Sequence, residues 1–123
     1  MKIGKETIYQ IQIVNWVKQC TKLKIYKIDN EGKRTTITDG KVNPMQANIA
    51  KKSGLTAGMY DLILPKGNHL FKGLWLEVKQ EKGILSPAQI QFGIDMIEDG
   101  YQALVCYSGE EGILMIKAFY GLE

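Results

Sequence analysis

Three polar residues near the middle of the chain, Asp61, Glu77 and Lys79, are of types that can take part in metal-assisted hydrolysis. Glu77 and Lys79 lie two residues apart in a segment, 74–79, in which leucine or valine alternates with other residues. Alternate side chains of a β-strand point to opposite faces of the sheet. The segment therefore predicts a strand with one face in the core and one charged face that carries both Glu77 and Lys79.

The position of Asp61 relative to this strand depends on how two neighbouring strands pair. A short apolar run, 60–64, precedes the strand and is separated from it by the loop 65–73. A loop of this kind favours antiparallel pairing. A register that opposes Asp61 to Glu77 or Lys79 would gather the three side chains at one end of a sheet, about 5 Å apart. A register shifted by one residue would place Asp61 on the other face.

Two carboxylates on one face suit Mg²⁺ or Mn²⁺, because these hard cations take oxygen ligands and keep several waters. Such an ion could polarise a phosphodiester and acidify a bound water, while Lys79 neutralises charge that grows in the transition state. The alternative is a cross-strand salt bridge on a solvated face, worth less than about 1 kcal/mol. Because a carboxylate two residues from a lysine is common on strands, the three residues by themselves favour this alternative.

The elements that must position these residues are predicted from hydrophobic spacing, helix caps and turn residues. Helices are predicted over 5–20, from Asn43 to Gly54, and from Ser86 to about Asp99. Strands are predicted over 23–28, 34–38, 60–64, 74–79, 101–107 and 113–119, the last two joined by a turn at 108–112. Helices and strands mixed in this order predict a single α/β domain, 1–123, with a mixed β-sheet flanked by α-helices.

Blocks of sequence around these residues resemble the VRR-NUC (virus-type replication and repair nuclease) family, a branch of the PD-(D/E)xK nuclease superfamily. The blocks are GLTAGMYDLILP (54–65), WLEVK (75–79) and KGILSPAQ (82–89). The resemblance extends upstream to Glu6, Gln10 and the segment NEGKR (30–34), and downstream through Gly100-Tyr101 and the strand that follows. It covers most of the chain in the expected order and implies a restriction-endonuclease-like fold.

The resemblance also implies a set of metal ligands. Asp61 and Glu77 would bind the ion, and the backbone carbonyl of Val78 would add a third ligand. Lys79 would be the catalytic lysine. Glu6, which matches an acidic residue on the first helix of the family, would contact the metal through water or bind a second ion.

Two glutamines have competing interpretations. Gln89 is the third residue after the predicted cap Ser86 and would complete a capping box, a structural role. The resemblance instead places Gln89 in the active site near the catalytic lysine, and one side chain is not expected to do both. Gln10 lies one helical turn after Glu6, so the two side chains face the same way. The alternative for that pair is a solvated helix edge.

The resemblance further implies contacts to nucleic acid by Asn30, Lys33, Arg34 and Lys82. A polar hairpin turn explains the segment 30–34 as well, and a simple loop explains Lys82. Tyr60 departs from the superfamily pattern, which has proline before the aspartate. Because that proline shapes the backbone and ligates nothing, the departure leaves the ligand set unchanged. Gly58 is expected to permit an unusual backbone just before Asp61.

The function implied is a DNA endonuclease that hydrolyses phosphodiesters with Mg²⁺ or Mn²⁺ and prefers branched, flapped or four-way-junction DNA. The resemblance also implies a homodimer, and a viral or mobile-element origin would suit the family. Two alternatives remain: a non-catalytic nucleic-acid-binding module on a nuclease fold, and a restriction-like or RNA-directed nuclease. The presence of all the acidic residues and of the lysine argues against the first of these.

Composition sets wider bounds on the protein. The formal net charge of +3 is compatible with phosphate binding through local clusters, of which one is Lys22, Lys24 and Lys27, although each cluster could equally be a solvated face. No apolar stretch is long enough for a membrane span or a signal region, which predicts a cytoplasmic protein with no membrane partner. Cys20 and Cys106 stand alone on apolar elements, which predicts two buried thiols and no zinc site.

Overall fold

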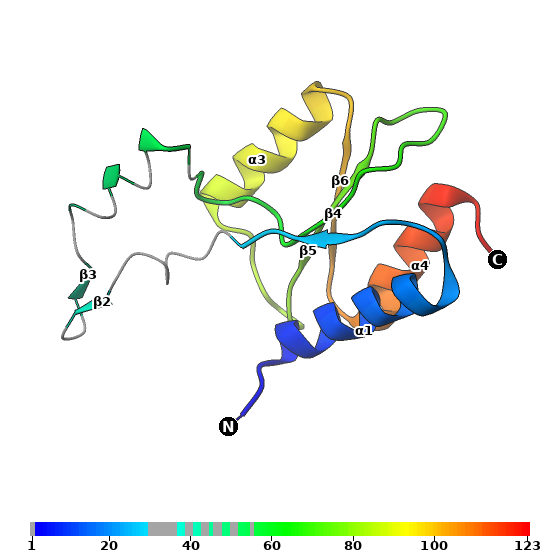
Figure 1. Cartoon of the computed structure of the whole chain (residues 1–123), viewed down its shortest axis with the longest axis horizontal. Coiled ribbons are helices and arrows are strands. Elements are labelled where there is room, and N and C mark those ends of the chain that lie inside the picture. The colour runs from blue at the N-terminus through cyan, green and yellow to red at the C-terminus, as the bar shows by residue number, and fades with distance from the viewer. Residues whose placement is uncertain are drawn as a thin grey trace.

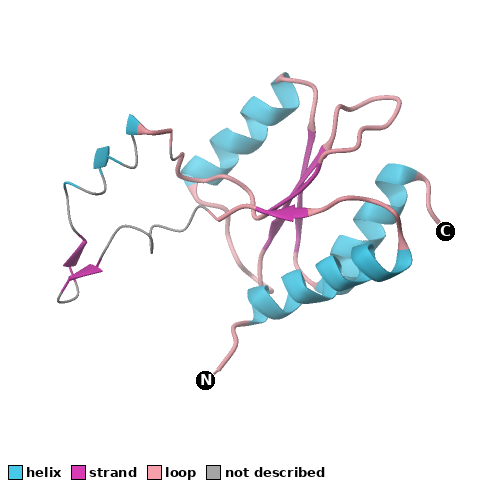
Figure 2. Cartoon of the chain, in the orientation of Figure 1, coloured by secondary structure: helices cyan, strands magenta, loops and turns pink. Residues whose placement is uncertain are grey.

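The structure is a computed structural model that describes residues 2–29, 37–38, 41–42, 45, 48–49, 52–54 and 56–123. Its elements, in chain order, are α1 (Lys5–Cys20), β1 (Tyr26–Lys27), β2 (Ile37–Thr38), β3 (Lys41–Val42), β4 (Leu62–Leu64), β5 (Leu74–Val78), α3 (Pro87–Glu98), β6 (Gln102–Cys106) and α4 (Gly109–Tyr120). Figure 1 shows α3 on one side of the strands and α1 with α4 on the other. Figure 2 shows the same three layers by type of element.

The main sheet has four strands in the order β1-β4-β5-β6. β4 pairs antiparallel with both β1 and β5, whereas β5 and β6 are parallel. The predicted mixed sheet flanked by helices is therefore confirmed. β2 and β3 form a separate antiparallel pair.

The hydrophobic core lies on both faces of this sheet. The larger cluster joins α1 and α4 to the sheet, and its fully buried members include Ile13, Val17, Leu62, Leu76 and Ile116. On the opposite face, the Trp75 ring packs edge-on against Phe92 of α3, with ring centroids 4.9 Å apart. Every residue of β5 is buried. The face predicted to be charged does carry Glu77, but it is buried as well, because α3 packs on it through Trp75.

Helices α1 and α3 lie where the sequence predicted them. In α1 the buried residues are Gln10, Ile13 and Val17, at the spacing of one helical face. α3 begins with Ser86 as its cap and Pro87 in the first turn. It ends before Gly100, whose φ of +96° suits glycine.

The predicted strand 113–119 is wrong, because this segment belongs to the helix α4. Ser108 caps it, with its Oγ accepting a hydrogen bond from the Glu111 N–H at 3.0 Å. Glu111 Oε1 in turn accepts from the Tyr107 N–H at 3.0 Å. Gly112 and Ile116 are buried and lie four residues apart, whereas Leu114 is exposed, which is helical spacing. The predicted turn 108–112 is in fact the helix start.

Three further predictions meet the structure in part. The strand predicted over 23–28 is reduced to Tyr26–Lys27. Of the strand predicted over 34–38, Ile37–Thr38 is a strand, and the rest lies outside the described residues. Of the helix predicted from Asn43 to Gly54, the residues described as helical are Met45, Asn48, Ile49 and Lys52.

Cys106 is buried as predicted, whereas Cys20 is exposed. No helix within the described residues is long and apolar enough to cross a membrane.

Candidate active site

The side chains of Asp61 and Glu77 each accept a hydrogen bond from the backbone of the neighbouring chain segment. The register pairs Leu62 with Leu76, and one further step places Asp61 opposite Glu77, as predicted. The Asp61 N–H donates to Glu77 Oε1 at 3.1 Å. The Val78 N–H donates to Asp61 Oδ2 at 3.2 Å. Each carboxylate is thus oriented by the main chain of the other strand.

The second carboxylate oxygen of Glu77, Oε2, lies near one amide donor and one ammonium group. The Gln89 Nε2 donates to Glu77 Oε2 at 2.7 Å. The Lys79 Nζ lies 3.5 Å from the same oxygen. Glu77 is only 2% exposed, and the Lys79 side chain is 14% exposed. Glu77 and Lys79 therefore belong to a largely buried cluster, and the alternative of a salt bridge on a solvated face is wrong.

Gln89 makes the contacts of both interpretations that the sequence set against each other, the capping box and an approach to Glu77. Its Oε1 accepts from the Ser86 N–H at 2.9 Å, and its own N–H donates to Ser86 Oγ at 3.1 Å, which completes the capping box of α3. Its Nε2 donates at the same time to Glu77. The expectation that one side chain would not do both is wrong, because an amide has an acceptor end and a donor end that can serve different partners.

Burial raises the pKa values of both carboxyl groups. Burial, which is the largest cause, and the negative charge of Asp61 raise the pKa of Glu77 to about 7, against the opposing effect of the Lys79 ammonium. Burial likewise raises the pKa of Asp61, and the hydrogen bond from the Val78 N–H opposes it. Each carboxylate therefore gains from any additional positive charge placed between them.

Glu6 lies at the edge of this cluster. Its Oε2 accepts from the Gln80 N–H at 3.1 Å, which ties the first turn of α1 to the chain just after β5. Its negative charge contributes to the raised pKa of Asp61. Among the described residues, no three Asp, Glu, His or Cys side chains come together as a ready set of metal ligands. The close pair is Asp61 with Glu77, and Glu6 stays outside it.

The Val78 carbonyl lies on the side of the strand that a metal ion at the carboxylates would require. The N–H and C=O of one strand residue point toward the same neighbouring strand. Because the Val78 N–H points to Asp61, its carbonyl points to the same side. The next residue, Lys79, donates its own N–H to the Cys106 carbonyl at 2.9 Å, toward β6.

Lys27 belongs to the site, although the sequence placed it only in a loose lysine cluster. A cavity of about 260 Å³ opens beside Asp61 and is lined by Lys27, Ile28, Asp29 and Asp61. The charge of Lys27 lowers the pKa of Asp61. The Ile28 N–H donates to the Asp61 carbonyl at 2.7 Å and fixes β1 beside this cavity. Only the strand order, with β1 next to β4, brings Lys27 there, and no local pattern encodes that order.

Gln10 is buried, so the alternative of a solvated helix edge is wrong for it. It is 9% exposed, and its Oε1 has no hydrogen-bond partner among the described residues. Gln10 and Lys27 line a mostly apolar cavity of about 210 Å³ together with residues of α1. Gln10 thus faces the β1 side of the molecule, where the Asp61 cavity also lies.

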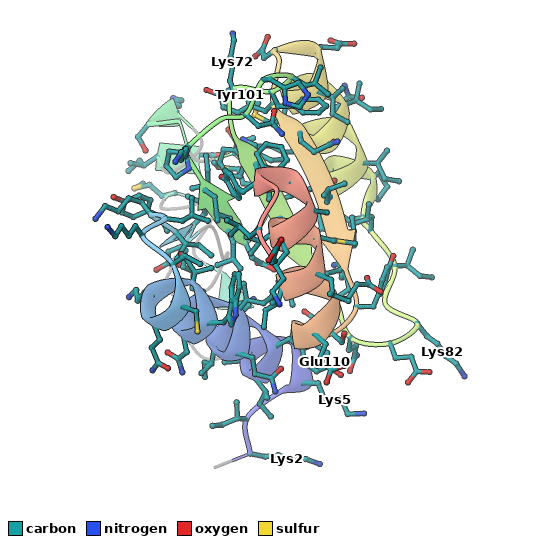
Figure 3. The ribbon with its side chains drawn as sticks, turned by 90° about the vertical axis from the view of Figure 1, so that its right-hand side faces the viewer. Lys2, Lys5, Lys72, Lys82, Tyr101 and Glu110 are labelled. Carbon is teal, nitrogen blue, oxygen red and sulfur yellow. The ribbon has the colours of Figure 1, made fainter. Side chains whose placement is uncertain are left out.

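Of the predicted contacts to nucleic acid, only Lys82 can be located. Asn30, Lys33 and Arg34 lie outside the described residues. Lys82 is exposed and has a φ of +66°, in a turn that the hydrogen bond from the Gly83 N–H to the Gln80 carbonyl closes at 2.8 Å. Figure 3 shows Lys82 projecting at the same end of the molecule as Lys2, Lys5 and Glu110.

Tyr60 and Gly58 shape the backbone that leads to Asp61. Tyr60 is buried and its ring lies 5.2 Å from the Phe92 ring, so it is a core residue. Gly58 has a φ of +88°, as expected for an unusual backbone. A Cβ added at Gly58 would lie 2.5 Å from the backbone of Ala88. Only glycine allows the chain to pass so close to the first turn of α3.

Comparisons with known proteins bear on the fold. A scan against models of protein families gives no match. A search of curated proteins gives none either. Among solved structures, the chain is similar to a "VRR_NUC domain protein", with a TM-score of 0.77 and 24% sequence identity over 99% of this chain and 93% of that chain. At this identity the likeness establishes the architecture: the chain has the α/β fold of that VRR_NUC domain protein.

Proposed function

We propose that the chain is a metal-dependent nuclease whose phosphodiester hydrolysis takes place at Asp61, Glu77 and Lys79. One observation carries the proposal: the buried carboxylate of Glu77 and the half-buried carboxylate of Asp61 lie opposite each other, on β5 and just before the start of β4, with a lysine and a glutamine on the same oxygen of Glu77. A buried pair of like charges is costly for stability and is typical of functional sites. The shared fold with a VRR_NUC domain protein supports the same assignment.

The donor set fits a hard divalent cation such as Mg²⁺ or Mn²⁺. Asp61, Glu77 and the Val78 carbonyl would hold it, and all three donors are oxygens. Burial raises the pKa values of both carboxyl groups, and at Glu77 the negative charge of Asp61 adds to the rise. A bound cation would relieve this repulsion. When bound, such an ion stabilises charge on the phosphate oxygens and lowers the pKa of a coordinated water.

The chain's own residues orient the reacting groups. The two backbone N–H groups fix one oxygen of each carboxylate, and Gln89 fixes a second oxygen of Glu77. Lys79 supplies a positive charge that can stabilise the attacking water and the charge that develops on the phosphate. The Lys79 side chain is only 14% exposed, so its electrostatic effect is stronger than it would be in water.

Positive side chains around the site would bind the phosphodiester backbone. Lys27 lines the cavity beside Asp61, and Lys82 projects at the same end of the molecule as Lys5. Asn30, Lys33 and Arg34 are proposed to join them. We propose branched DNA as the substrate and a homodimer as the acting form, because two sites related by twofold symmetry suit a roughly twofold junction.

Removal of either carboxylate is expected to abolish cleavage. In Asp61→Asn and Glu77→Ala, cleavage with Mg²⁺ or Mn²⁺ should be lost, while binding to the same DNA, measured by fluorescence anisotropy, should remain. Glu98→Gln is the matched control, because Glu98 is exposed at the opposite end of α3. Cleavage that survives in either variant, or in EDTA, would contradict the two-carboxylate metal site.

The substrate class is tested with a panel of four-way junction, flap, linear duplex and single-stranded DNA, together with a matched RNA. The proposal expects faster cleavage of the branched substrates. Binding without cleavage of every substrate by the intact chain would instead identify a non-catalytic module. Preferred cleavage of RNA would replace the DNA assignment and leave the metal site intact.

A further inference from the structure

A second cavity lies at the other end of the edge strand, where α1 gives way to β1. Its volume is about 380 Å³. Among the residues that the structure describes, its lining includes three lysines, one exposed aromatic ring and no acidic residue, and consists of Lys18, Thr21, Lys22, Leu23, Lys24, Ile25 and Tyr26. We call this feature the lysine cleft, meaning Lys18, Lys22, Lys24 and Tyr26.

The backbone of the lysine cleft is held by local hydrogen bonds. Thr21 Oγ1 donates to the Val17 carbonyl at 2.6 Å and accepts from the Leu23 N–H at 3.0 Å. Ile25 is buried in the core. The buried Ile25 and the half-buried Leu23 alternate with Lys22 and Lys24, which are both exposed. The two ammonium groups are thus presented on one side by a fixed main chain.

Helix stability alone explains only part of this arrangement. Positive charges near a helix C-terminus interact favourably with its free carbonyls, which accounts for Lys18 and Lys22. It does not account for Lys24, four residues beyond the helix, or for the Tyr26 ring, which is 55% exposed. Lysines combined with an exposed aromatic ring form the usual surface for a nucleic-acid strand, with the lysines on phosphates and the ring against a sugar or base.

The lysine cleft is connected to Asp61 by a single run of extended chain. Ile28 lies opposite Asp61, and Figure 1 shows the segment that leads there from the end of α1. At about 3.3 Å per residue, Lys24 is about 13 Å and Lys22 at most about 20 Å from Ile28 along this run. Successive nucleotides of a DNA strand rise about 3.4 Å along the helix axis. The separation therefore corresponds to roughly four to six nucleotides.

We propose that the lysine cleft binds the phosphodiester backbone of the substrate about four to six nucleotides from the bond that is cleaved. This inference rests on the proposed function for the identity of the substrate. The cleft gives the protein a second point of contact, so that a long arm of nucleic acid lies along the β1 edge. It sets how much of the substrate must be present on one side of the cleavage point.

The test measures binding in EDTA, so that no cleavage is needed. The double variant Lys22→Ala/Lys24→Ala is compared with Lys66→Ala/Lys72→Ala, which removes the same charge from the exposed loop between β4 and β5. Fluorescence anisotropy is recorded over a salt series for a long duplex of about 20 base pairs and for a short duplex of about four base pairs that is closed as a hairpin. Thermal melting checks that each variant folds.

For the long duplex, the first pair should weaken binding about tenfold and reduce the slope of log affinity against log salt by about two, since each phosphate contact contributes about 0.9. For the short duplex, the same variant should match the unaltered protein. The control pair should leave the slope unchanged. Tyr26→Ala should also bind the long duplex more weakly than the unaltered protein does. Tyr26→Trp should bind it as well as the unaltered protein does, because the larger ring still packs against the strand.

An equal loss in both double variants would overturn the proposal, because total charge would then explain the effect. An unchanged slope in the first pair, or no binding by the unaltered protein, would overturn it as well. The two proposals fail separately. If the double variant changes the salt slope as expected but the unaltered protein cleaves nothing, the proposed nuclease function is overturned and the proposal for the lysine cleft stands. If the unaltered protein cleaves DNA but the double variant leaves the salt slope unchanged, the proposal for the lysine cleft is overturned and the nuclease function stands.

Discussion

At the scale of single residues, Lys79 and Gln89 approach the same oxygen of Glu77 from different elements. The Lys79 Nζ comes from the end of β5 at 3.5 Å, and the Gln89 Nε2 comes from the first turn of α3 at 2.7 Å. One partner brings a full charge and the other a neutral hydrogen bond. Their removal should therefore have different consequences for the reaction.

Lys79→Ala is expected to lower turnover far more than metal affinity. The ammonium is not an oxygen ligand, so its loss removes charge stabilisation from the reaction while the carboxylates remain. The expected fall in turnover is at least about a hundredfold, similar to the loss of one preorganised donor to a transition state. Single-turnover kinetics and isothermal titration with Mn²⁺ measure the two quantities. An equal loss in both would assign Lys79 to positioning of the metal site.

Gln89→Glu is expected to separate the two roles of Gln89. Glutamate at this position retains the acceptor of the capping box but presents a carboxylate to Glu77 in place of a donor. Cleavage activity or metal affinity should fall about tenfold to a hundredfold, as for other residues that support metal ligands. Ser86→Ala is the matched control, because it removes only the cap and should cost about 1 kcal/mol of stability.

Thermal melting and metal titration of Gln89→Glu and Ser86→Ala distinguish the effect of Gln89 on Glu77 from its effect on the cap of α3. If Ser86→Ala loses as much activity as Gln89→Glu, Gln89 acts only through the helix. The sequence could identify Gln89 for each role, since each has its own local signature. It could not predict their combination, because that depends on how α3 is placed beside β5.

At the scale of elements, a helix or strand is predicted well from the sequence when the residues that determine it lie close together in the chain. Alternation in 74–79 and the apolar run 60–64 predicted the antiparallel pair, and of the registers left open the structure has the one that opposes Asp61 to Glu77. α4 was missed although its start carries a legible signal, Ser108 followed three residues later by Glu111. The apolar run after it was taken for a strand, because such runs do not distinguish a buried helix from a strand. The place of Lys27 required the strand order, which no local pattern gives.

Gly58→Ala tests how the loop before β4 supports the site. The added Cβ would meet the Ala88 backbone at 2.5 Å, and the φ of +88° is strained for alanine. The loop must then move away from α3 and shift Asp61 with it. We expect a loss of stability of about 1–3 kcal/mol, together with weaker metal binding. Gly54→Ala is the control, because its φ is also positive but its added Cβ meets nothing within 4 Å. Equal metal affinity in both variants would contradict the coupling.

At the scale of the whole molecule, the buried carboxylates make stability depend on pH and on metal. The pKa of Glu77 is about 7 in the folded protein, against an ordinary value of 4.5. Between these pH values, the folded protein retains a proton that the unfolded chain has released. The free energy of unfolding of the metal-free protein should therefore fall as pH rises from about 4.5 to 7, by on the order of 1–3 kcal/mol.

Denaturant unfolding in EDTA at pH 5 and pH 8 measures this difference. Glu77→Gln should flatten the dependence, because its amide does not titrate. Mn²⁺ should restore stability to the unaltered protein at pH 8, since it binds the folded state. A dependence on pH that persists unchanged in Glu77→Gln would contradict the assignment to this carboxyl group.

The hydrogen bonds of the site also differ in how much chain they enclose. Those among Asp61, Glu77, Val78 and Gln89 join residues 12 to 17 positions apart, whereas the bond from Gln80 to Glu6 spans 74. Closing a short loop costs less entropy, and contacts close in sequence form sooner. The carboxylate pair and its glutamine can thus assemble as one hairpin with one helix, before α1 docks. The centre of the site is therefore contained in residues 61–98 and includes no residue of α1 or α4.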